Sequence, residues 1–454
     1  MNSLASADIA AEVAIVGAGI SGSAAAYDLL QCGVEDIVVL EASDQPGGRV
    51  RNMSLAGVTV DAGAQFVGPT QTALRGLLTA FDLPLVPINQ EGRIVSPIST
   101  EHDNALELFA DALTKVGSSL DLTAPWTHPD AKQLDSMTVI EWARRIGITD
   151  RKTLDYISGR VESAITGPGE DVSALWYAYF IEAAGGWHEQ TGGTLESRVS
   201  GGTQQIPLCV GDMLEDRLRL NTPVVRIEQN EQYVRLVTAG GTKIVARQAI
   251  LACSPREIAR MHIEPALPPA RSALNSRWCM GAGMKFAIAF EDPFWRDLGF
   301  NGQIISDYCS PVGAVLDNAP VDSSGPGILV GFASPRRLEK FLPATPEQRA
   351  RVVEAHIHHA FGVSAPNAID YTEHLWRNEP WVSGCMSPNR PGTILDSWHC
   401  IRRSEGRLHF AGTETSDVFN GYMEGAIRAA YRATSEVTDA LAAEPDLSTV
   451  ALHS

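Results

Sequence analysis

The stretch that decides the fold is Val13–Glu41, VAIVGAGISGSAAAYDLLQCGVEDIVVLE. A short apolar strand, Val13–Val16, leads directly into the pattern Gly17-Ala18-Gly19-Ile20-Ser21-Gly22, and an alanine-rich helix follows. A second apolar strand, Ile37–Leu40, ends at Glu41. This order predicts one β-α-β unit with GxGxxG at the turn from strand to helix, which is typical of dinucleotide-binding folds.

Each part of this unit has a physical task. Gly17 allows the tight turn, Gly19 lets the backbone approach a pyrophosphate, and Gly22 lets the helix pack on the strand. The helix N-terminus offers unpaired N–H groups and a positive dipole to phosphate. Glu41 follows at a distance that suits hydrogen bonds from ribose hydroxyls. In Gly47-Gly48-Arg49 the glycines allow close wrapping and Arg49 can pair with the pyrophosphate, which is typical of FAD rather than NAD sites.

Composition narrows the class of protein. The chain has 454 residues, 36 Lys plus Arg, 54 Asp plus Glu and a formal net charge of −18. That charge argues against nucleic-acid binding, which needs a basic face, and it suits cationic small molecules. No apolar run approaches the roughly 18 residues of a transmembrane helix, and no signal peptide is visible. The seven cysteines are scattered singly, so we expect a soluble protein in a reducing, cytoplasmic compartment.

Further strands and helices follow along the chain. One strand is expected within Leu218–Val225, and a hairpin joins Tyr233–Thr238 to Lys243–Ala246 through Gly240-Gly241. Ala249–Ala252 is expected as a separate buried strand. Near the C-terminus, the strand Leu408–Phe410 precedes a glycine-rich turn and a long helix that starts at Tyr422.

The nucleotide-binding elements therefore occupy three separated blocks. The fold class that we expect is α/β, a Rossmann-like FAD-binding domain interrupted by insertions that form an α+β substrate domain. The expected FAD-binding domain comprises residues 5–85, 199–274 and 379–445, the substrate domain comprises 86–198 and 275–378, and 446–454 form a polar tail.

Several segments together resemble the flavin monoamine oxidase family. They occur in the family's order and extend over about residues 10 to 445. In chain order, the first two segments resemble a flavin-contacting stretch and a helix of the substrate domain. The next two resemble the active-site lysine segment and a tryptophan and cysteine beside the flavin. The last two resemble the C-terminal signature of the family. The segments are Asp61–Gln71, Val172–Trp176, Lys285 with Pro293–Arg296, Trp376 with Cys385, Phe410–Thr415, and Gly421–Ala426.

The resemblance implies an FAD-dependent oxidation of an amine. A C–H bond next to nitrogen would deliver hydride to flavin N5 and leave an imine, which water would hydrolyse to an aldehyde or ketone. Oxygen would then reoxidise the flavin and give hydrogen peroxide. The implied partners are a small-molecule amine and oxygen, with no nucleic acid, no membrane and no metal. Whether the protein forms a homodimer is left open.

The resemblance also assigns roles to individual residues. Catalytic roles fall to Lys285, Tyr422 and Trp376. Contacts to the cofactor fall to Gly17, Gly19, Gly22, Glu41, Gly48, Arg49, Ala64, Gln65, Val224, Cys385, Thr413, Glu414 and Met423. Contacts to the substrate fall to Met386, Phe419, Tyr422, Phe332 and Ile305.

Two of these residues have alternative interpretations. Lys285 stands among apolar neighbours, so it is either an edge residue with its ammonium in solvent or a buried ammonium at flavin N5. Cys385 occupies the place where some family members carry a thioether to the flavin 8α carbon. The alternative is a small buried residue beside FAD that is bound without a covalent link.

The aromatic cage of the family is incomplete in this sequence. Tyr422 would form one wall against the amine, but Met386 stands where monoamine oxidases have the second aromatic residue. Half of the cage is therefore missing or is supplied by another side chain, such as Phe419 or Trp376. The identity of the amine stays open.

Two other functions remain as alternatives. One is an oxidase or dehydrogenase for an amino acid or a secondary amine. An amino-acid substrate would need an arginine in the cavity, and the sequence places none there. The other is a flavin-loaded protein without turnover, and the presence of Lys285 and Tyr422 argues against it.

Three histidines follow a capping box at Thr345. We interpret His356, His358 and His359 as a solvated helix face rather than a metal site.

Overall fold

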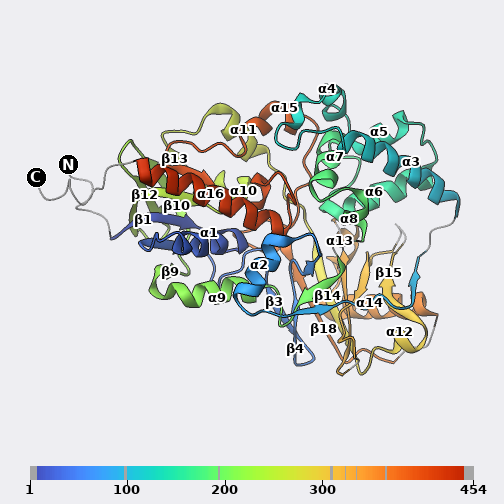
Figure 1. Ribbon diagram of the computed structural model, residues 1–454. Coiled ribbons are helices and arrows are strands. Elements are labelled where there is room, and N and C mark those ends of the chain that lie inside the picture. The colour runs from blue at the N-terminus through green and yellow to red at the C-terminus, as the bar shows by residue number, and fades with distance from the viewer. Residues whose placement is uncertain are drawn as a thin grey trace, which may run out of the picture.

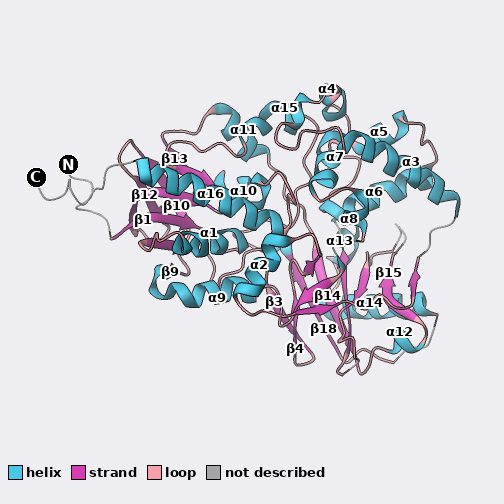
Figure 2. Ribbon diagram, viewed as in Figure 1, coloured by secondary structure: helices cyan, strands magenta, loops and turns pink. Residues whose placement is uncertain are grey.

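The structure is a computed structural model that describes residues 8–96, 100–192, 195–306, 310–322, 324–333, 335–362 and 366–443. Two large sheets organise the molecule. Figure 1 shows the first sheet on the left, the second at the lower right and a group of helices above the second. Figure 2 shows that the N-terminal and C-terminal helices cover one face of the first sheet.

The first sheet carries the expected dinucleotide-binding unit. Strand β1 pairs in parallel with both β2 and β12, with Val13 opposite Ile37 on one side and Gln248 on the other. The sheet has the order β13-β10-β11-β12-β1-β2-β9, and β19 pairs with β12. The bounds are β1 Ile9–Val16, β2 Ile37–Leu40, β9 Leu218–Arg219, β10 Val224–Gln229, β11 Val234–Thr238, β12 Lys243–Leu251, β13 His262–Glu264 and β19 Leu408–Phe410.

Two expectations for this sheet are wrong. Lys243–Ala246 and Ala249–Ala252 are not separate strands, because the first and all of the second except Ala252 lie in the single strand β12, which pairs with β11 at its start and with β19 at its end. Leu218–Val225 is not one strand, because β9 ends at Arg219 and β10 begins at Val224. The two halves pair with different neighbours, β2 and β11, so the chain must turn between them.

The close approach of helix to strand depends on one glycine. Helix α1, Ile20–Gln31, starts directly after Gly19 and packs on α16, Met423–Ala443. A Cβ atom on Gly22 would lie 1.8 Å from the carbonyl oxygen of Gly17. Only glycine permits this contact, so the sequence pattern and the packing of α1 on β1 have the same cause.

The second sheet is built around a strand that is buried along its whole length. Every residue of β14 is buried, and β14 pairs in antiparallel fashion with β17 and β18. The order is β18-β14-β17-β16-β15-β7. The bounds are β7 Arg93–Val95, β14 Met284–Phe290, β15 Phe300–Ile304, β16 Val315–Asp317, β17 Gly327–Ala333 and β18 Asp370–Leu375.

Helices cover the second sheet from above (Figure 1). The most apolar of them, α7, comes from the run Ala174–Ala183 and is almost entirely buried. Its N-terminus is capped by the Ser173 side chain, which accepts a hydrogen bond from the Trp176 N–H. The group is α3 Thr100–Gly117, α4 Ala131–Asp135, α5 Val139–Arg145, α6 Arg151–Ile165, α7 Ala174–Ala183 and α8 Trp187–Thr191.

The remaining elements connect these layers. The shorter strands are β3 Asn52–Leu55, β4 Val58–Asp61, β5 Phe66–Val67, β6 Leu85–Pro87 and β8 Ser197–Val199. The other helices are α2 Thr72–Ala80, α9 Gln205–Leu214, α10 Pro255–Ile258, α11 Pro269–Arg277, α12 Phe294–Asp297, α13 Pro335–Phe341, α14 Pro346–Phe361 and α15 Thr393–Ser397.

The helix with three histidines begins as predicted but differs in its surroundings. Thr345 and Gln348 form the expected capping box of α14. His356 is not simply solvated, because its two ring nitrogens contact the hydroxyls of Ser306 and Ser310 at 2.9 and 3.2 Å. In the described part of the chain, no group of three potential ligands is arranged to hold a metal.

None of the described helices combines the length and apolar character that a membrane span needs.

Candidate active site

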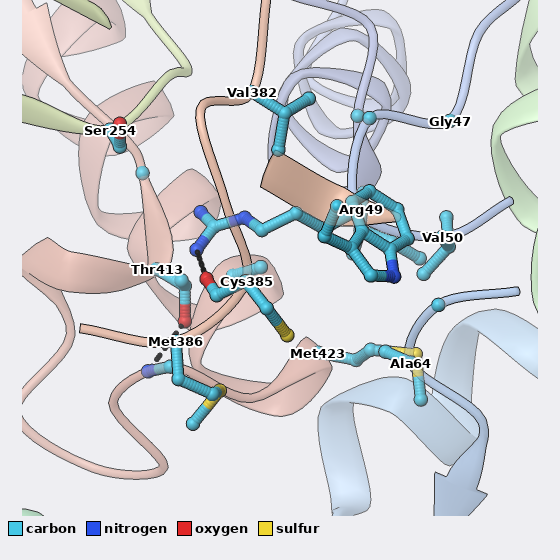
Figure 3. Close-up of a pocket in the computed structure, with 18 of the residues that line it drawn as sticks. Gly47, Arg49, Val50, Ala64, Ser254, Val382, Cys385, Met386, Thr413 and Met423 are labelled. Atoms are coloured by element: carbon cyan, nitrogen blue, oxygen red, sulfur yellow. Dashed lines mark hydrogen bonds between the residues drawn. The ribbon is translucent and has the colours of Figure 1, made fainter. Parts of the chain in front are cut away.

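A cavity of about 710 Å³ extends from the glycine turn after β1 to β14 and β17 of the second sheet. Figure 3 shows part of its wall around Arg49, Cys385 and Met423. Most of the residues singled out from the sequence line it, and their individual roles stay predictions. They are Gly17, Gly19, Glu41, Gly48, Arg49, Ala64, Gln65, Val224, Lys285, Phe332, Trp376, Cys385, Met386, Thr413, Tyr422 and Met423.

Four of the expected contact residues lie elsewhere. Gly22 is at the packing contact between α1 and β1, and Glu414 lies behind Arg49. Phe419 stands behind Tyr422, with the two rings edge to face at 5.9 Å. The backbone N–H of Ile305 donates to Val95 at the far side of the second sheet. None of the four is among the described residues that line the cavity.

The glycine end of the cavity forms an anion cradle. Gly19 precedes α1 and offers no side chain to cap it, so the first N–H groups of the helix face the cavity. The Gly47-Gly48 turn approaches closely, since a Cβ on Gly48 would lie 3.3 Å from Cα of Gly19. Glu41 accepts hydrogen bonds from the N–H groups of Ala18 and Ser43 at 2.7 and 2.8 Å, which fixes its carboxylate beside the turn.

Arg49 brings a positive charge to the middle of the cavity. Its Nη1 atom lies 2.7 Å from Oε1 of Glu414, whose side chain is completely buried. Burial by itself lowers the pKa of Arg49, but the ion pair with Glu414 more than offsets this, so the pKa is raised. Figure 3 shows the guanidinium reaching the backbone of Cys385. A positive charge at this place can meet the pyrophosphate of a dinucleotide.

These observations fit FAD. The helix N-terminus and the glycine turns can hold a pyrophosphate, and any side chain larger than glycine at position 48 would crowd the turn. Glu414 keeps a second buried oxygen, Oε2, that has no partner among the described residues, so its negative charge is met by Arg49 alone, whose side chain lines the cavity. The cavity then continues beyond Arg49 to Lys285, which gives room for the flavin ring.

Lys285 is buried rather than exposed at an edge. It lies on β14, an inner strand of the second sheet, and only 2% of its surface is accessible. Its Nζ atom donates to the Gly63 carbonyl at 3.0 Å and to Oε1 of Gln65 at 2.6 Å. Burial lowers the pKa of Lys285 to about 8, and the charges of Asp61 and Cys385 oppose that shift. The ammonium is therefore close to its midpoint of titration in neutral to mildly alkaline solution.

Two further polar side chains, Asn318 and Asp61, support Lys285, and Asn318 carries no signal in the sequence. Nε2 of Gln65 donates to Oδ1 of Asn318, which turns Oε1 of Gln65 toward the lysine. Asp61 is buried and accepts hydrogen bonds from the N–H and hydroxyl of Thr203 at 2.7 and 2.8 Å. Burial raises the pKa of Asp61, and the nearby charge of Lys285 opposes the rise. Asn318 comes from the end of β16, far from the flavin-contacting stretch that resemblance identifies.

The aromatic walls are fixed by contacts outside the cavity. The indole N–H of Trp376 donates to the Ala62 carbonyl at 2.9 Å. The ring of Tyr422 lies nearly parallel to Phe180, with centroids 5.8 Å apart and planes at 20°. Phe180 comes from α7 and is a support that the sequence does not reveal. Met386 lies next to Tyr422, because its Cε atom would be 3.0 Å from a Cβ on Gly421.

Cys385 presents its side chain to the same cavity. Its N–H donates to the Gly281 carbonyl at 2.9 Å, which holds the loop in place. Figure 3 shows the sulfur on the side of the cavity where Met423 lies. Burial raises the pKa of the Cys385 thiol, while the charges of Arg49 and Lys285 act in the opposite direction.

Helices α6 and α8 add a polar section to the wall that the sequence does not predict. Arg160, Glu162 and Ser163 of α6 and Gln190 of α8 all line the cavity. The sequence places no arginine among the substrate contacts, whereas the structure shows that Arg160 lines the cavity. The helical pattern of α6 indicates a helix, but it does not show which of its side chains reach a cavity formed with distant segments.

Comparison with known proteins agrees with this geometry. The family profile described as flavin containing amine oxidoreductase matches residues 20–438. Flavin-containing amine oxidase B of Mus musculus is 31% identical over 462 residues, covering 96% of this chain and 87% of that protein. Cyclohexylamine oxidase from Brevibacterium oxydans IH-35A superposes with a TM-score of 0.90 at 29% identity, covering 95% of this chain and 99% of that structure.

A structure of putrescine oxidase bound to putrescine superposes with a TM-score of 0.89 at 26% identity, covering 95% of this chain and 99% of that one. The predicted mixed α/β fold, with FAD-binding and substrate parts, is thereby confirmed. Because the profile and the relatives extend over nearly the whole chain, this protein belongs to the flavin-containing amine oxidoreductase family and is a flavin-dependent amine oxidase.

Proposed function

We propose that the chain oxidises a small amine at the Lys285 end of the cavity and passes the electrons to oxygen, which becomes hydrogen peroxide. The observation that carries this proposal is the buried ammonium of Lys285, which lines the same cavity as Arg49 and the glycine cradle. Burying a cation costs free energy unless polar groups bind it, so a lysine in a sheet usually keeps its ammonium in solvent, whereas that of Lys285 is buried.

The cofactor would be held along the whole cavity. Gly17, Gly19 and the N-terminus of α1 would bind the pyrophosphate, and Glu41 would bind the ribose. Arg49 would add charge at the centre, with Glu414 fixing its guanidinium. Bound FAD supplies the two-electron acceptor for a C–H bond next to nitrogen.

Lys285 would hold one proton of its Nζ ammonium ready to be donated in the cavity. An ammonium has three donors, and two of them go to the Gly63 carbonyl and Gln65. The third donor is left for a water molecule or for charge that develops on oxygen. With a pKa of about 8, Lys285 can both hold and release this proton at neutral pH.

Tyr422 and Trp376 would give flat walls for the amine. Each ring is held by a contact on its far side, Tyr422 by Phe180 and Trp376 by the Ala62 carbonyl. Fixed rings leave few orientations for the substrate, so the entropy of orienting the reacting C–H bond is lost on binding and not in the chemical step. Their faces also attract a cationic amine.

We further propose that FAD is bound without a covalent link. Cys385 lines the cavity, but burial raises the pKa of its thiol. The thiolate is the nucleophilic form, so a raised pKa opposes the bond. The homodimer and the cytoplasmic location stay predictions.

Peroxide release from a panel of amines tests the function. The purified yellow protein should release hydrogen peroxide with at least one small amine and should lose its flavin absorbance when the same amine is added without oxygen. Bleaching without peroxide in air would indicate a dehydrogenase that uses another acceptor. A yellow protein that no amine bleaches would contradict the proposal and would favour a flavin-loaded protein without turnover.

A further inference from the structure

Charged side chains line the cavity at several points, and almost all of them are satisfied within the protein. Some accept backbone N–H groups, and others form ion pairs or donate to carbonyls. These residues are Glu41, Arg49, Glu162, Glu257, Arg260 and Lys285. Arg160 of α6 is the exception within the part of the chain that the structure describes.

The guanidinium of Arg160 has one contact, and that contact is with an aromatic face. It lies over the ring of Trp187, with Cζ 5.8 Å from the ring centroid. Among the described residues it has neither an ion pair nor a hydrogen bond. A cation–π contact leaves the five N–H donors of an arginine unused, and these donors form a planar fork that matches a carboxylate.

Arg160 lines the same cavity as Tyr422. The ring of Phe109 joins Arg160 to Tyr177, because it contacts both Trp187, which lies under the Arg160 guanidinium, and Tyr177. Burial raises the pKa of Tyr177, and the charge of Arg160 opposes that rise. Tyr177 in turn acts on Tyr422, and the amide of Gln190 lies against the Tyr422 hydroxyl. Gln190, Tyr422 and Arg160 all line the cavity.

The nearby carboxylates do not neutralise Arg160. Glu162 accepts the backbone N–H of Arg336 at 2.9 Å, and Glu189 accepts the hydroxyl of Thr70 at 2.6 Å. Within the described residues neither carboxylate forms an ion pair with Arg160. The cavity therefore contains one guanidinium that, in the described part of the chain, has an aromatic contact but no ion-pair partner.

We propose that Arg160 binds the anionic end of the substrate, so that the substrate is an amine that also carries a carboxylate distant from the reacting nitrogen. The inference rests on the proposed amine oxidation and names its substrate class. The flat walls receive the amine, and the fork of Arg160 binds the carboxylate beyond Tyr422 in bidentate fashion. Such a substrate is a zwitterion, so the acidic surface of the protein does not repel it.

The test compares charged and neutral forms of one skeleton with the flavin-loaded protein. The substrates are ω-amino carboxylates from aminobutanoate to aminooctanoate and the methyl ester of each. At one chain length, kcat/KM for the acid should exceed that for the ester by at least about tenfold, the value of one charge-assisted hydrogen bond. Arg160→Gln should bring this ratio close to one, mainly through KM, and Arg160→Lys should keep part of it.

Arg93 offers a matched control. Its guanidinium also lies over an aromatic ring, 4.5 Å from the centroid of Phe300, but it does not line the cavity. Arg93→Gln should leave the ratio of acid to ester at its original value. Acids that are no better than esters at every length would overturn the proposal. A ratio that Arg160→Gln leaves unchanged would overturn it as well.

Binding without turnover separates this inference from the oxidase function. Calorimetry with carboxylates of the same lengths that lack the amino group, such as hexanoate, should show binding that Arg160→Gln weakens by about tenfold. If no amine is oxidised but this dependence is found, the proposed oxidation fails and the carboxylate site stands. If amines are oxidised and carboxylate binding does not depend on Arg160, only the present inference fails.

Discussion

Nζ of Lys285 on β14 donates a hydrogen bond across 2.6 Å to Oε1 of Gln65, which directly precedes β5, and both residues line the cavity. An amide can accept only through its oxygen, so the orientation of Gln65 matters. That orientation is fixed on the other side by Asn318, which accepts from Nε2 of Gln65. A residue outside the recognised motifs thus controls which way the lysine is hydrogen-bonded.

We expect Asn318→Leu to lower the pKa of Lys285 below about 8. Without the acceptor at position 318, Gln65 can turn its amide, and the bond that favours the charged lysine weakens. Loss of a hydrogen bond to a charged group corresponds to a shift of about one pKa unit. The pH dependence of kcat and of the flavin absorbance measures this. Asn301→Leu removes another buried amide of the second sheet and should leave the profile unchanged.

We expect the stability of the parent protein to rise relative to Lys285→Met as pH increases from about 8 to 10.5. Burial lowers the pKa of Lys285 from 10.5 to about 8, so in this range the unfolded chain carries a proton that the folded chain does not. The cost of the buried charge is fully present below pH 8 and disappears above 10.5. The difference in the free energy of unfolding should change by about 3 kcal/mol.

Urea unfolding at about pH 7 and about pH 10 measures this difference. A difference between parent and variant that stays constant over this range would mean that Lys285 is not destabilised by its surroundings. Titrating groups that do not interact with Lys285 are common to both proteins and cancel in the comparison, whereas Asp61 and Cys385, on which its charge acts, do not cancel fully.

The β-α-β unit could be predicted because its signals are local. The glycines, the apolar strands and Glu41 lie within one short stretch, and each acts on atoms of the same stretch, as Gly22 does on Gly17. The capping box at Thr345 is local in the same way. The walls of the cavity that match family motifs could be named from resemblance for the same reason, since each motif keeps its residues together.

The polar section of the cavity could not be predicted because it depends on packing between distant segments. The position of Arg160 on α6 gives no sign that its side chain meets Trp187 of α8 or faces a cavity. Asn318 likewise meets Gln65 only because β16 lies across the cavity from the turn after β4. The sequence predicts two strands where β12 is one, because polar Arg247-Gln248 separates the two apolar segments, and the pairing with β11 and β19 that makes the strand continuous comes from distant segments.

Gly22→Ala should prevent stable FAD binding, whereas Gly76→Ala should not. An added Cβ at position 22 would lie 1.8 Å from the Gly17 carbonyl oxygen, so α1 would have to move away from β1 and the phosphate cradle. Gly76 lies in α2 with no atom within 4 Å of an added Cβ, and alanine there should stabilise the helix by about 0.5–1 kcal/mol. Flavin content and thermal unfolding of the two variants give the comparison, and full flavin content in Gly22→Ala would contradict the assigned packing role.

Acid precipitation should release the flavin into the supernatant. Burial raises the pKa of the Cys385 thiol, which limits the thiolate that a thioether bond would need. Cys385→Ala and Cys253→Ala should therefore behave like the parent protein. Cys253 is a suitable control because its thiol also lines the cavity and its pKa is also raised by burial. A yellow pellet from the parent and from Cys253→Ala, but not from Cys385→Ala, would instead establish a covalent link.

Met386→Tyr should narrow the amine site. The thioether end of Met386 lies beside the backbone of Gly421, directly before Tyr422, and both side chains line the cavity. Methionine is flexible and fills irregular space, whereas a second aromatic ring would impose a flat wall opposite Tyr422. Each aromatic face adds about 0.5–2 kcal/mol of attraction for a cationic group. The variant should therefore use small arylalkylamines better and bulky or N-substituted amines worse than the parent.

The ratio of kcat/KM for benzylamine to that for a bulky secondary amine measures this selectivity. Tyr422→Phe is the companion variant, because it keeps the aromatic face that rests on Phe180 and should cause only a modest loss for both amines. If the wall at position 386 decides the width of the site, the ratio rises in Met386→Tyr and stays near its original value in Tyr422→Phe. An equal ratio in all three proteins would mean that the amine does not pass between these two side chains.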